Sequence, residues 1–433
     1  MVALSKFQPK KILVAGDLML DAYTIGKANR ISPEAPVAVI SVTGEEQRPG
    51  GAGNVALNLV SLGCPVTLLA RTGADSSGLH LKEDLDREGV DTSFLFVDPT
   101  WPTPVKHRVI AENQQVVRID REVIAPIPED LEEKIIGSLS KILEGVFALA
   151  ISDYGKGFLT ETLLSRLIAA AGEKNIPVIV DPKGFDFSKY YGAGCIKPNV
   201  SEAYAAASLP LHAPLEQVAK NIFTQTACQS LLITRSEKGM SLFHATGERI
   251  DFGVRERQVK DVTGAGDTVL AALSASVASG MSLSDAACLA NLAAGIAIET
   301  FGCARVSISA LARRLLKENV GCKIFDEEHL FAFHQALSDA PFVVLGISNE
   351  NQLIPSLIGK IHREIKKPGI DLVVYLQDPN PTVEALEFLA SLHEIDFVVV
   401  KREGFAKFIE KLEPQSSYLV ENGQLKICDS AFV

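Results

Sequence analysis

The most informative absence in this sequence of 433 residues is that of a long hydrophobic run. No apolar stretch reaches the roughly 20 residues that a membrane-spanning helix requires. The opening residues, MVALSKFQPKKILVAGD, contain no extended apolar segment before the first expected strand. We therefore expect a cytoplasmic protein with no membrane partner.

Paired cysteines and excess positive charge are also absent. The 7 cysteines are scattered with no CxxC spacing, which argues against both a disulfide framework and a zinc site. The formal net charge is −11, which argues against a surface dedicated to nucleic acid. The net charge does not exclude anionic small substrates, because an acidic protein can still contain a local basic pocket.

The chain is too long for one ordinary hydrophobic core, so more than one domain is expected. From about residue 130, apolar runs such as FALAISDY (147–154) and IPVIVDPKG (176–184) alternate with helical segments. This rhythm predicts an α/β fold whose parallel sheet is covered on both faces. Two earlier segments, about 35–45 and 103–122, alternate apolar and polar residues and are expected to form a small β lid.

A domain boundary is expected within residues 313–329, where a basic helix end precedes a new series of apolar runs. We predict a first domain over 1–318. The segments PFVVLGIS, IDLVVYLQD and IDFVVVKREG then predict a second, smaller α/β domain over 319–433.

Polar side chains follow several of the expected strands. These residues are Asp17, Asp153, Asp181, Asn199 and Thr234. Ligands of open parallel sheets bind beyond the carboxyl ends of the strands, so we expect a binding site where these residues converge.

The segment DVTGAGDTVLAAL (261–273) places a glycine-rich turn before an aspartate and an apolar helix. Exposed N–H groups of Ala265, Gly266 and Asp267 at the helix start would form an anion hole. The Asp267 carboxylate would then accept a proton from an attacking hydroxyl, which suits phosphoryl transfer. The alternative interpretation is an aspartate that only caps a helix after a glycine turn.

A second glycine cluster, RPGGAGNVA (48–56), lacks the Lys-Ser/Thr of a P-loop. It also lacks a preceding strand that would suit a dinucleotide-binding fold. We interpret it as a place where backbone and Asn54 approach a polyhydroxylated ligand.

Together these motifs resemble those of the ribokinase (PfkB-type) carbohydrate kinases. More narrowly, GDLMLDAY, RISPEAPVAV, RPGGAGNVA, NQQVVRID, SDYGKG, DPKG, KPNVSE and TRSEKGMSL resemble the kinase half of the bifunctional D-glycero-β-D-manno-heptose-7-phosphate kinase/ADP-heptose synthases. The resemblance runs from about residue 10 to 318. It implies a ribokinase-like sandwich with a β lid. It also implies ATP-dependent phosphorylation of heptose 7-phosphate at its anomeric hydroxyl, for lipopolysaccharide-core precursors.

The resemblance also implies roles for individual residues. Asp267 would be the catalytic base, and Gly264, Ala265 and Gly266 would form the anion hole. The residues implied to hold the sugar are Asp17, Gly50, Gly51 and Asn54, with Asp21 nearby. Asp153 is a further candidate because it stands at a strand end, and the alternative is a carboxylate that only caps a loop or helix. The residues implied on the ATP side are Asn199, Glu202, Thr234, Ser236, Gly239 and Asn291. Lys183 of the DPKG segment is a further candidate for contact with a nucleotide phosphate.

A Mg²⁺ ion held by Asn199 and Glu202, directly or through water, is implied with the ATP. A monovalent cation stays an open question, and a homodimer formed through the lid is expected by analogy. The substrate's own phosphate requires cations, because an unpaired dianion is costly to bury. The candidate cations are Arg30, Arg48, Lys106, Arg108 and Lys156, and the sequence does not choose among them.

The second domain resembles the nucleotidyltransferase of the bifunctional family, whose hallmark has two histidines three residues apart after Phe-Asp. Phe325-Asp326 and His329 stand in place, but Ala332 occupies the position of the second histidine. His334 comes two residues too late, about 200° around a helix. We expect a degenerate domain without adenylyltransferase activity. The alternatives are a truly bifunctional enzyme, a kinase of another sugar, and a structural or binding module.

Overall fold

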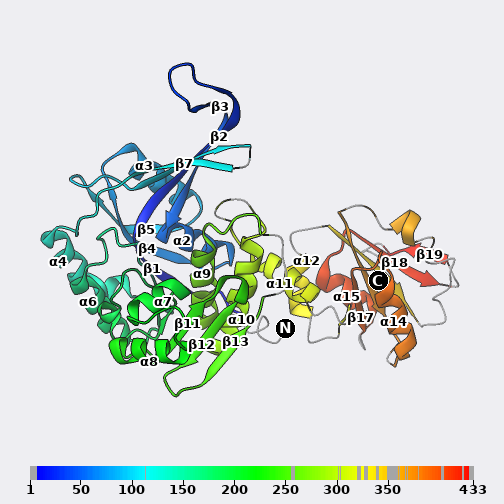
Figure 1. Ribbon diagram of the computed structural model, residues 1–433. Helices are drawn as coiled ribbons and strands as arrows, with labels where there is room; N and C mark the ends of the chain where they lie inside the picture. Colours follow the sequence, from blue (N-terminus) through cyan, green and yellow to red (C-terminus); the bar gives the residue numbers. More distant parts are fainter. Residues whose placement is uncertain are drawn as a thin grey trace. The chain divides into compact units, whose positions relative to one another are not determined.

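The computed structural model divides into two compact units, Phe7–Ser307 and Ile308–Val433 (Figure 1). The structure describes residues 7–112, 114–254, 259–300, 302, 304–318, 323–325, 330–337, 341–348, 359, 361–365, 367, 369–378, 380–400, 404–421 and 424–428.

The first unit is built on a nine-stranded sheet with the order β13-β12-β11-β10-β9-β8-β1-β4-β5. The neighbouring strands pair in parallel from β11 to β5, and β12 and β13 add an antiparallel edge. The strands are β1 (Ile12–Gly16), β4 (Val66–Gly73), β5 (Asp91–Asp98), β8 (Ala148–Ser152), β9 (Val178–Asp181), β10 (Cys195–Ile196), β11 (Ser230–Thr234), β12 (Met240–His244) and β13 (Arg249–Phe252). The central strands β1, β4 and β8 are buried along their whole length, as expected of strands covered on both faces.

Helices cover both faces of this sheet. One face carries α4 (Glu129–Gly137), α5 (Leu139–Ile142), α6 (Glu161–Glu173), α7 (Val200–Ala206) and α8 (Leu215–Thr226), whose apolar residues share one core cluster with the strands. The other face carries α2 (Ala52–Ser61) and α9 (Ala265–Ala278), which pack on β1 and β8. Two further helices complete the unit, α3 (Ser76–Arg87) beside β5 and α10 (Leu283–Ala297) beside α9.

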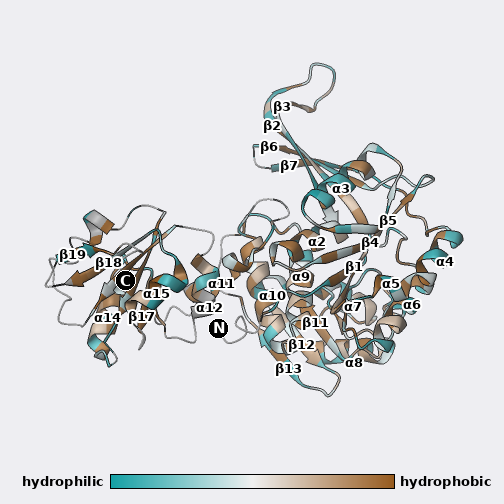
Figure 2. Cartoon of the chain, turned by 180° about the vertical axis from the view of Figure 1, so that it is seen from behind, coloured by the Kyte–Doolittle hydropathy of each residue, from teal (hydrophilic) through white to brown (hydrophobic). Residues whose placement is uncertain are grey.

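A separate four-stranded sheet forms the lid, in the order β3-β2-β6-β7. Its strands are β2 (Leu18–Ile31), β3 (Ala38–Gly51), β6 (Val105–Ala111) and β7 (Gln114–Arg121), and they project from the body of the unit (Figures 1 and 2). The lid is larger than the sequence predicted, because β2 was not expected as a strand. β3 runs directly to Gly51, but as an antiparallel lid strand, so the second glycine cluster has no preceding strand of the kind found in a dinucleotide-binding fold.

The second unit has a six-stranded sheet in the order β14-β17-β16-β15-β18-β19, parallel except for β19. Its strands are β14 (Ile324–Phe325), β15 (Phe342–Ile347), β16 (Asp371–Leu376), β17 (Phe397–Val400), β18 (Ser416–Glu421) and β19 (Gln424–Ile427). Its helices include α11 (Ile308–Glu318), α12 (Leu330–Leu337), α14 (Val383–Ser391) and α15 (Phe405–Leu412). Within the described ranges, neither unit has a helix of the length and apolarity needed to cross a bilayer.

Candidate active site

The first turn of α9 lies at the carboxyl edge of the nine-stranded sheet, packed against β8 and β9. Gly264 precedes the helix with φ 77°, a left-handed conformation that glycine adopts without strain. Asp267 follows in the first turn and is only 3% exposed. The GAGD segment thus buries a carboxylate at a helix N-terminus, as the sequence predicted.

Two neutral donors hold the Asp267 carboxylate. The Asn54 side-chain amide donates to Oδ2 over 2.8 Å, and the Tyr154 hydroxyl donates to Oδ1 over 2.8 Å. Burial raises the pKa of Asp267 to about 7, with the Asn54 hydrogen bond acting in the opposite direction. A carboxyl group with this pKa exchanges protons readily at neutral pH, which is what a general base requires.

Tyr154 was missed by the sequence analysis. It lies in the loop after β8, in the SDYGKG segment. The sequence feature that could have indicated Tyr154 is its position directly after Asp153, at the sheet edge where the other polar strand ends lie. The tyrosine itself gave no indication that its partner would be Asp267.

The Asp17 carboxylate holds the loop that carries Tyr154. Its Oδ2 accepts hydrogen bonds from the backbone N–H of Tyr154 at 2.9 Å and of Lys156 at 3.0 Å, and its Oδ1 accepts from Phe158 at 3.3 Å. Asp17 is therefore engaged with the backbone, and its contacts favour a positioning role. Direct contact between Asp17 and a sugar stays a prediction.

Gly50 and Gly51 bring β3 against two carboxylate-bearing segments. A side chain on Gly50 would meet Asp21 Oδ2 at 2.2 Å. Gly51 has φ 57°, and a side chain there would meet the Asp17 carbonyl oxygen at 2.5 Å. Glycine is thus required at Gly51, whereas a side chain at Gly50 would displace the Asp21 carboxyl group.

A buried ion pair lies next to Gly266 in the first turn of α9. Lys197 Nζ is 2.9 Å from Asp181 Oδ1, and Lys197 is only 2% exposed. A Cβ atom on Gly266 would lie 3.7 Å from Lys197 Nζ and 3.6 Å from Asp181 Oδ2. Lys197 was also missed, although the lysine of IKPN directly follows β10.

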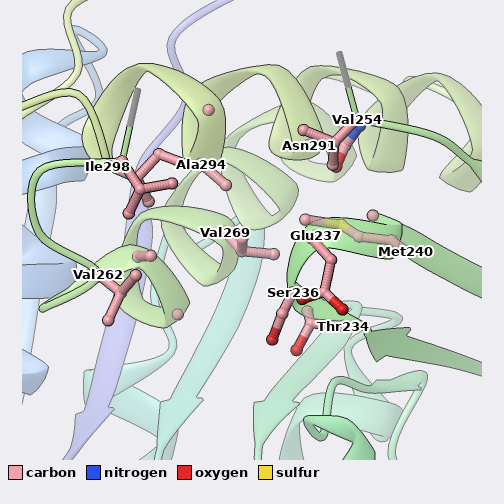
Figure 3. A pocket seen from close by; sticks show the side chains of 15 residues that line it. Thr234, Ser236, Glu237, Met240, Val254, Val262, Val269, Asn291, Ala294 and Ile298 are labelled. Atoms are coloured by element: carbon pink, nitrogen blue, oxygen red, sulfur yellow. The ribbon is translucent and has the colours of Figure 1, made fainter. Parts of the chain in front are cut away.

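A pocket of about 700 Å³ opens beside the first turn of α9 (Figure 3). The predicted residues Ala265, Gly266, Thr234, Ser236, Gly239 and Asn291 all line it. The remaining wall is largely apolar and includes Val262, Val269, Ala294 and Ile298 (Figure 3). A largely apolar pocket that ends at helix N–H groups suits an aromatic base attached to phosphates.

Asn199 and Glu202 form a capping box at the start of α7. The Asn199 side chain accepts from the Glu202 N–H over 2.9 Å, and Glu202 Oε2 accepts from the Asn199 N–H over 3.1 Å. Glu202 Oε1 also lies 3.2 Å from Lys183 Nζ. Among the described residues, no group of three or more His, Cys, Asp or Glu side chains is arranged to hold a metal by itself.

Asp153 and the predicted cations have partners of their own. The Asp153 oxygens accept from the Gly155 N–H, Lys189 Nζ and the Tyr190 hydroxyl over 2.6–2.7 Å, which favours the alternative that Asp153 caps this loop. The ion pairs that include predicted cations are Arg48–Glu46, Arg108–Asp21 and Lys156–Glu122, while Arg30 is exposed in the lid. Lys106 has no such pair among the described residues.

Most of the expected nucleotidyltransferase motif, including Asp326 and His329, lies outside the described residues. His334 is exposed in the last turn of α12. Its predicted displacement from the motif stays a prediction.

The first unit has the fold of the ribokinase-like carbohydrate kinases. Ribokinase from Arabidopsis thaliana, solved with ribose and ATP, matches with a TM-score of 0.56 and 20% identity, covering 71% of this chain and 99% of its own. Phosphofructokinase-2 from Escherichia coli matches with a TM-score of 0.60 and 21% identity, covering 72% of this chain and 100% of its own. The predicted fold class is therefore confirmed.

Sequence comparison identifies a narrower family within the ribokinase-like carbohydrate kinases. The pfkB family carbohydrate kinase profile matches residues 9–310. The bifunctional protein HldE of Trichlorobacter lovleyi is 49% identical over 69% of this chain and 61% of that protein. HldE of Geobacter metallireducens is 41% identical over 95% of this chain and 87% of that protein. The chain belongs to the pfkB family of carbohydrate kinases and, within it, to the family of the bifunctional HldE proteins, which confirms the predicted resemblance.

Proposed function

We propose that this protein transfers the γ-phosphoryl group of ATP to the anomeric hydroxyl of D-glycero-D-manno-heptose 7-phosphate. The product is the 1,7-bisphosphate, a precursor in ADP-heptose synthesis. The observation that carries this proposal is the buried Asp267 carboxylate, held by Asn54 and Tyr154 beside the 700 Å³ pocket that shares Ala265 and Gly266.

Each residue of the site has a separate role in the proposed reaction. Asp267 takes the proton of the sugar hydroxyl, whose oxygen attacks the γ-phosphorus while ADP leaves. The first-turn N–H groups of α9 and the ammonium of Lys197 stabilise the negative charge on the migrating phosphoryl oxygens. Asn54 and Tyr154 keep the carboxylate oriented toward the acceptor. The Asp17 carboxylate keeps the Tyr154 loop in place.

The carboxylate and amide donors at the nucleotide end fit a magnesium ion. Mg²⁺ binds through one or two carboxylates and the substrate phosphates while it keeps several waters, so a full protein cage is not needed. Glu202, Asn199 and Asp181 are the oxygen donors available. When bound, the ion neutralises charge on the ATP phosphates. Lys183, whose Nζ pairs with Glu202, would contact the same phosphates, and this pairing supports its place in the proposal.

Phosphate transfer by the purified protein tests the proposal. Heptose 7-phosphate, fructose 6-phosphate and ribose are supplied separately with Mg²⁺–ATP, and the products are identified by mass spectrometry. We expect bisphosphate from the heptose substrate. Faster turnover of either other sugar would assign the chain to another specificity within the pfkB family.

For the second unit we propose a structural or binding module without adenylyltransferase activity. The support is the absence of the second motif histidine from the sequence, where Ala332 stands. Incubation of ATP with heptose 1-phosphate tests this proposal. Formation of ADP-heptose would contradict it and would show that the chain is bifunctional, in agreement with the name of its HldE relatives.

We also propose a homodimer formed through the lid. The exposed apolar side chains of this sheet include Ile31, Val42, Val116, Val117 and Ile119. Exposed clusters of this kind mark interaction surfaces. Light scattering should give twice the chain mass, and Val117→Glu should give the monomer.

A further inference from the structure

A buried arginine lies beside the loop that carries Tyr154. Arg71 is near the end of β4 and is only 1% exposed. Its guanidinium carbon lies 3.9 Å from the centroid of the Trp101 ring, and its Nη1 is 3.3 Å from Asp98 Oδ2. Burying a charge is costly unless pairing and hydrogen bonds offset the lost hydration, so the other partners of Arg71 indicate what this charge holds in place.

Three backbone carbonyl groups accept hydrogen bonds from this guanidinium. Nη2 donates to Lys156 over 3.2 Å and to Ala125, and Nη1 donates to Pro126 over 3.3 Å. Lys156 lies in the Tyr154 loop, residues 153–158, whereas Ala125 and Pro126 follow β7. The planar fork of the guanidinium thus joins two segments that are separate in the sequence.

Both ends of the β6–β7 hairpin of the lid meet at Arg71. The chain enters this hairpin through residues 99–104 and leaves it through residues 122–127. Trp101, whose ring faces the guanidinium, belongs to the entering segment, and its Nε1 donates to the Val123 carbonyl of the leaving segment over 2.7 Å. Arg71 therefore fixes the base of the hairpin from both sides.

The leaving segment lies directly against the Tyr154 loop. The Ile127 N–H donates to the Gly157 carbonyl over 3.2 Å. Gly157 has φ 96°, and a side chain there would meet the Ala125 carbonyl oxygen at 2.0 Å. Because the two backbones are in such close contact, a displacement of the leaving segment would also displace the loop.

Opposite charges hold the two kinds of backbone group in the Tyr154 loop. Asp17 accepts from three of its N–H groups, and Arg71 donates to one of its carbonyl groups. Burial lowers the pKa of Arg71, and the charges of Asp98 and Asp17 act in the opposite direction. The loop places the Tyr154 hydroxyl 2.8 Å from Asp267 Oδ1, and such a hydrogen bond weakens steeply when its geometry departs from the optimum.

We propose that Arg71 is a positioning residue for phosphoryl transfer: it holds the Tyr154 loop and both ends of the β6–β7 hairpin in the arrangement in which Tyr154 donates to Asp267. This inference rests on the proposed function, in which Asp267 is the base. Arg71 acts on the base only through Tyr154. A lysine keeps the charge at this position but lacks the fork that reaches several carbonyl groups at once.

The test is a double-mutant cycle of Arg71→Lys and Tyr154→Phe. The kcat/KM for heptose 7-phosphate is measured as a function of pH around the pKa of Asp267, about 7, in the wild type, both single variants and the double variant. KM for ATP is measured in each protein, and thermal unfolding verifies that each is folded. A cycle of this kind separates an effect that passes through Tyr154 from one that does not.

Arg249→Lys is the matched control. Arg249 lies on β13, at the edge of the sheet opposite β5, and pairs with Glu216 and Asp251. Its guanidinium also lies over an aromatic ring, that of Phe243. The same substitution there removes the same fork from contacts that involve neither the lid nor the Tyr154 loop.

We expect Arg71→Lys to move the acidic limb of the kcat/KM profile upward by about half a pH unit to one pH unit, because a weakened hydrogen bond from Tyr154 raises the pKa of Asp267. At pH 7, kcat/KM should fall by about 2- to 5-fold. KM for ATP should stay that of the wild type. In the Tyr154→Phe background, Arg71→Lys should cause no further shift, and Arg249→Lys should leave the limb in place.

An unmoved limb in folded Arg71→Lys would overturn the inference, because Arg71 would then contribute to stability alone. A further shift of the same size in the double variant would also overturn it, because Arg71 would then not act through Tyr154. If Arg71→Lys does not fold, Trp101→Leu replaces it in the cycle under the same two criteria, since it removes the ring that faces the guanidinium but no charge.

Failure of the proposed function gives a different result. Wild-type protein would then not phosphorylate heptose 7-phosphate, whatever the Arg71 variants do. The pH profiles are in that case measured with the sugar that the protein does phosphorylate, because the contacts from Arg71 to Tyr154 and Asp267 do not depend on the acceptor.

Discussion

The two units differ in where they bury charge, although both are built on mostly parallel sheets. The first unit buries Asp17, Asp21, Arg71, Lys197 and Asp267, several of them at the carboxyl edge of the sheet. In the described part of the second unit, the buried polar residues are Ser309 and Ser417, and neither is charged.

Burying a charge costs free energy unless it is paired or hydrogen-bonded, so a fold retains buried charges where they serve a purpose. The first unit pairs or hydrogen-bonds each of these groups and leaves Asp267 with a raised pKa. The second unit keeps an apolar core that includes Val374, Val398 and Val420. The comparison indicates that apolar strands are enough to hold a mostly parallel sheet together, as in the second unit, whereas the first unit also keeps buried charged groups at its strand ends.

The largest effect should come from Asp267→Asn. We expect kcat to fall by about 10²- to 10⁴-fold, the usual contribution of a positioned base. ATP binding should persist, because the pocket walls are unchanged. Steady-state kinetics and nucleotide titration measure the two quantities. Near-normal turnover would show that Asp267 is not the base. The buried charge of the first unit would then have no catalytic role to set it apart from the second unit.

Tyr154→Phe should give the next largest effect. The base acts when deprotonated, so activity falls as the pH drops through the pKa of Asp267, about 7. The Tyr154 hydroxyl lowers this pKa, and its loss should move the acidic limb of the kcat/KM profile upward by about one pH unit. At pH 7, kcat/KM of the variant should therefore be roughly 3- to 10-fold lower than that of the wild type.

Tyr190→Phe is the matched control for Tyr154→Phe. The Tyr190 hydroxyl also donates to a buried carboxylate over 2.6 Å, but that carboxylate belongs to Asp153 and not to the base Asp267. We expect a loss of about 1–2 kcal/mol in the free energy of unfolding and an unmoved acidic limb. A shift of the limb in both variants would mean that Tyr154 acts only on general stability.

A smaller effect is expected from Asn291→Ala in the wall of the pocket. The Asn291 amide donates to the Gly253 carbonyl over 2.9 Å and holds the loop beyond β13. We expect KM for ATP to rise by about 3- to 10-fold, the loss of about one hydrogen bond. The same KM for ATP in the variant would place the base of the nucleotide elsewhere.

The smallest effect should come from His334→Ala in the second unit. This exposed side chain should change the free energy of unfolding by no more than about 0.5 kcal/mol. Mass spectrometry should give the same product with both proteins. Loss of a nucleotide sugar on this substitution would reverse the comparison, because the second unit would then be catalytic.

Much of the first unit could be read from local patterns. The buried strands β8, β9 and β11 were predicted because continuous apolar runs ended in polar residues. The GAGD turn was predicted because glycine at Gly264 and an acidic residue in the first helical turn are local features. The pocket-lining residues Thr234 and Asn291 followed from the family resemblance and lie together as expected.

The lid and two site residues were harder to predict. Only Asp17 separates the end of β1 from the start of β2, so the sequence suggests a single strand followed by a loop. Tyr154 and Lys197 are ordinary residues in their own segments. Their importance comes from partners 113 residues away in the case of Tyr154 and Asp267, and such distant pairing has no local signature.

The sequence by itself determined the alternation of strands and helices and the glycine turns. It also singled out Asp267 as the candidate base, because each of these features depends on neighbours within a few residues. Only the tertiary structure decided which groups surround that carboxylate and which carboxylate each cation of the lid pairs with. Hydrogen bonds and ion pairs form between whatever side chains the packed sheets bring within about 3–4 Å, and that proximity is a property of the folded chain.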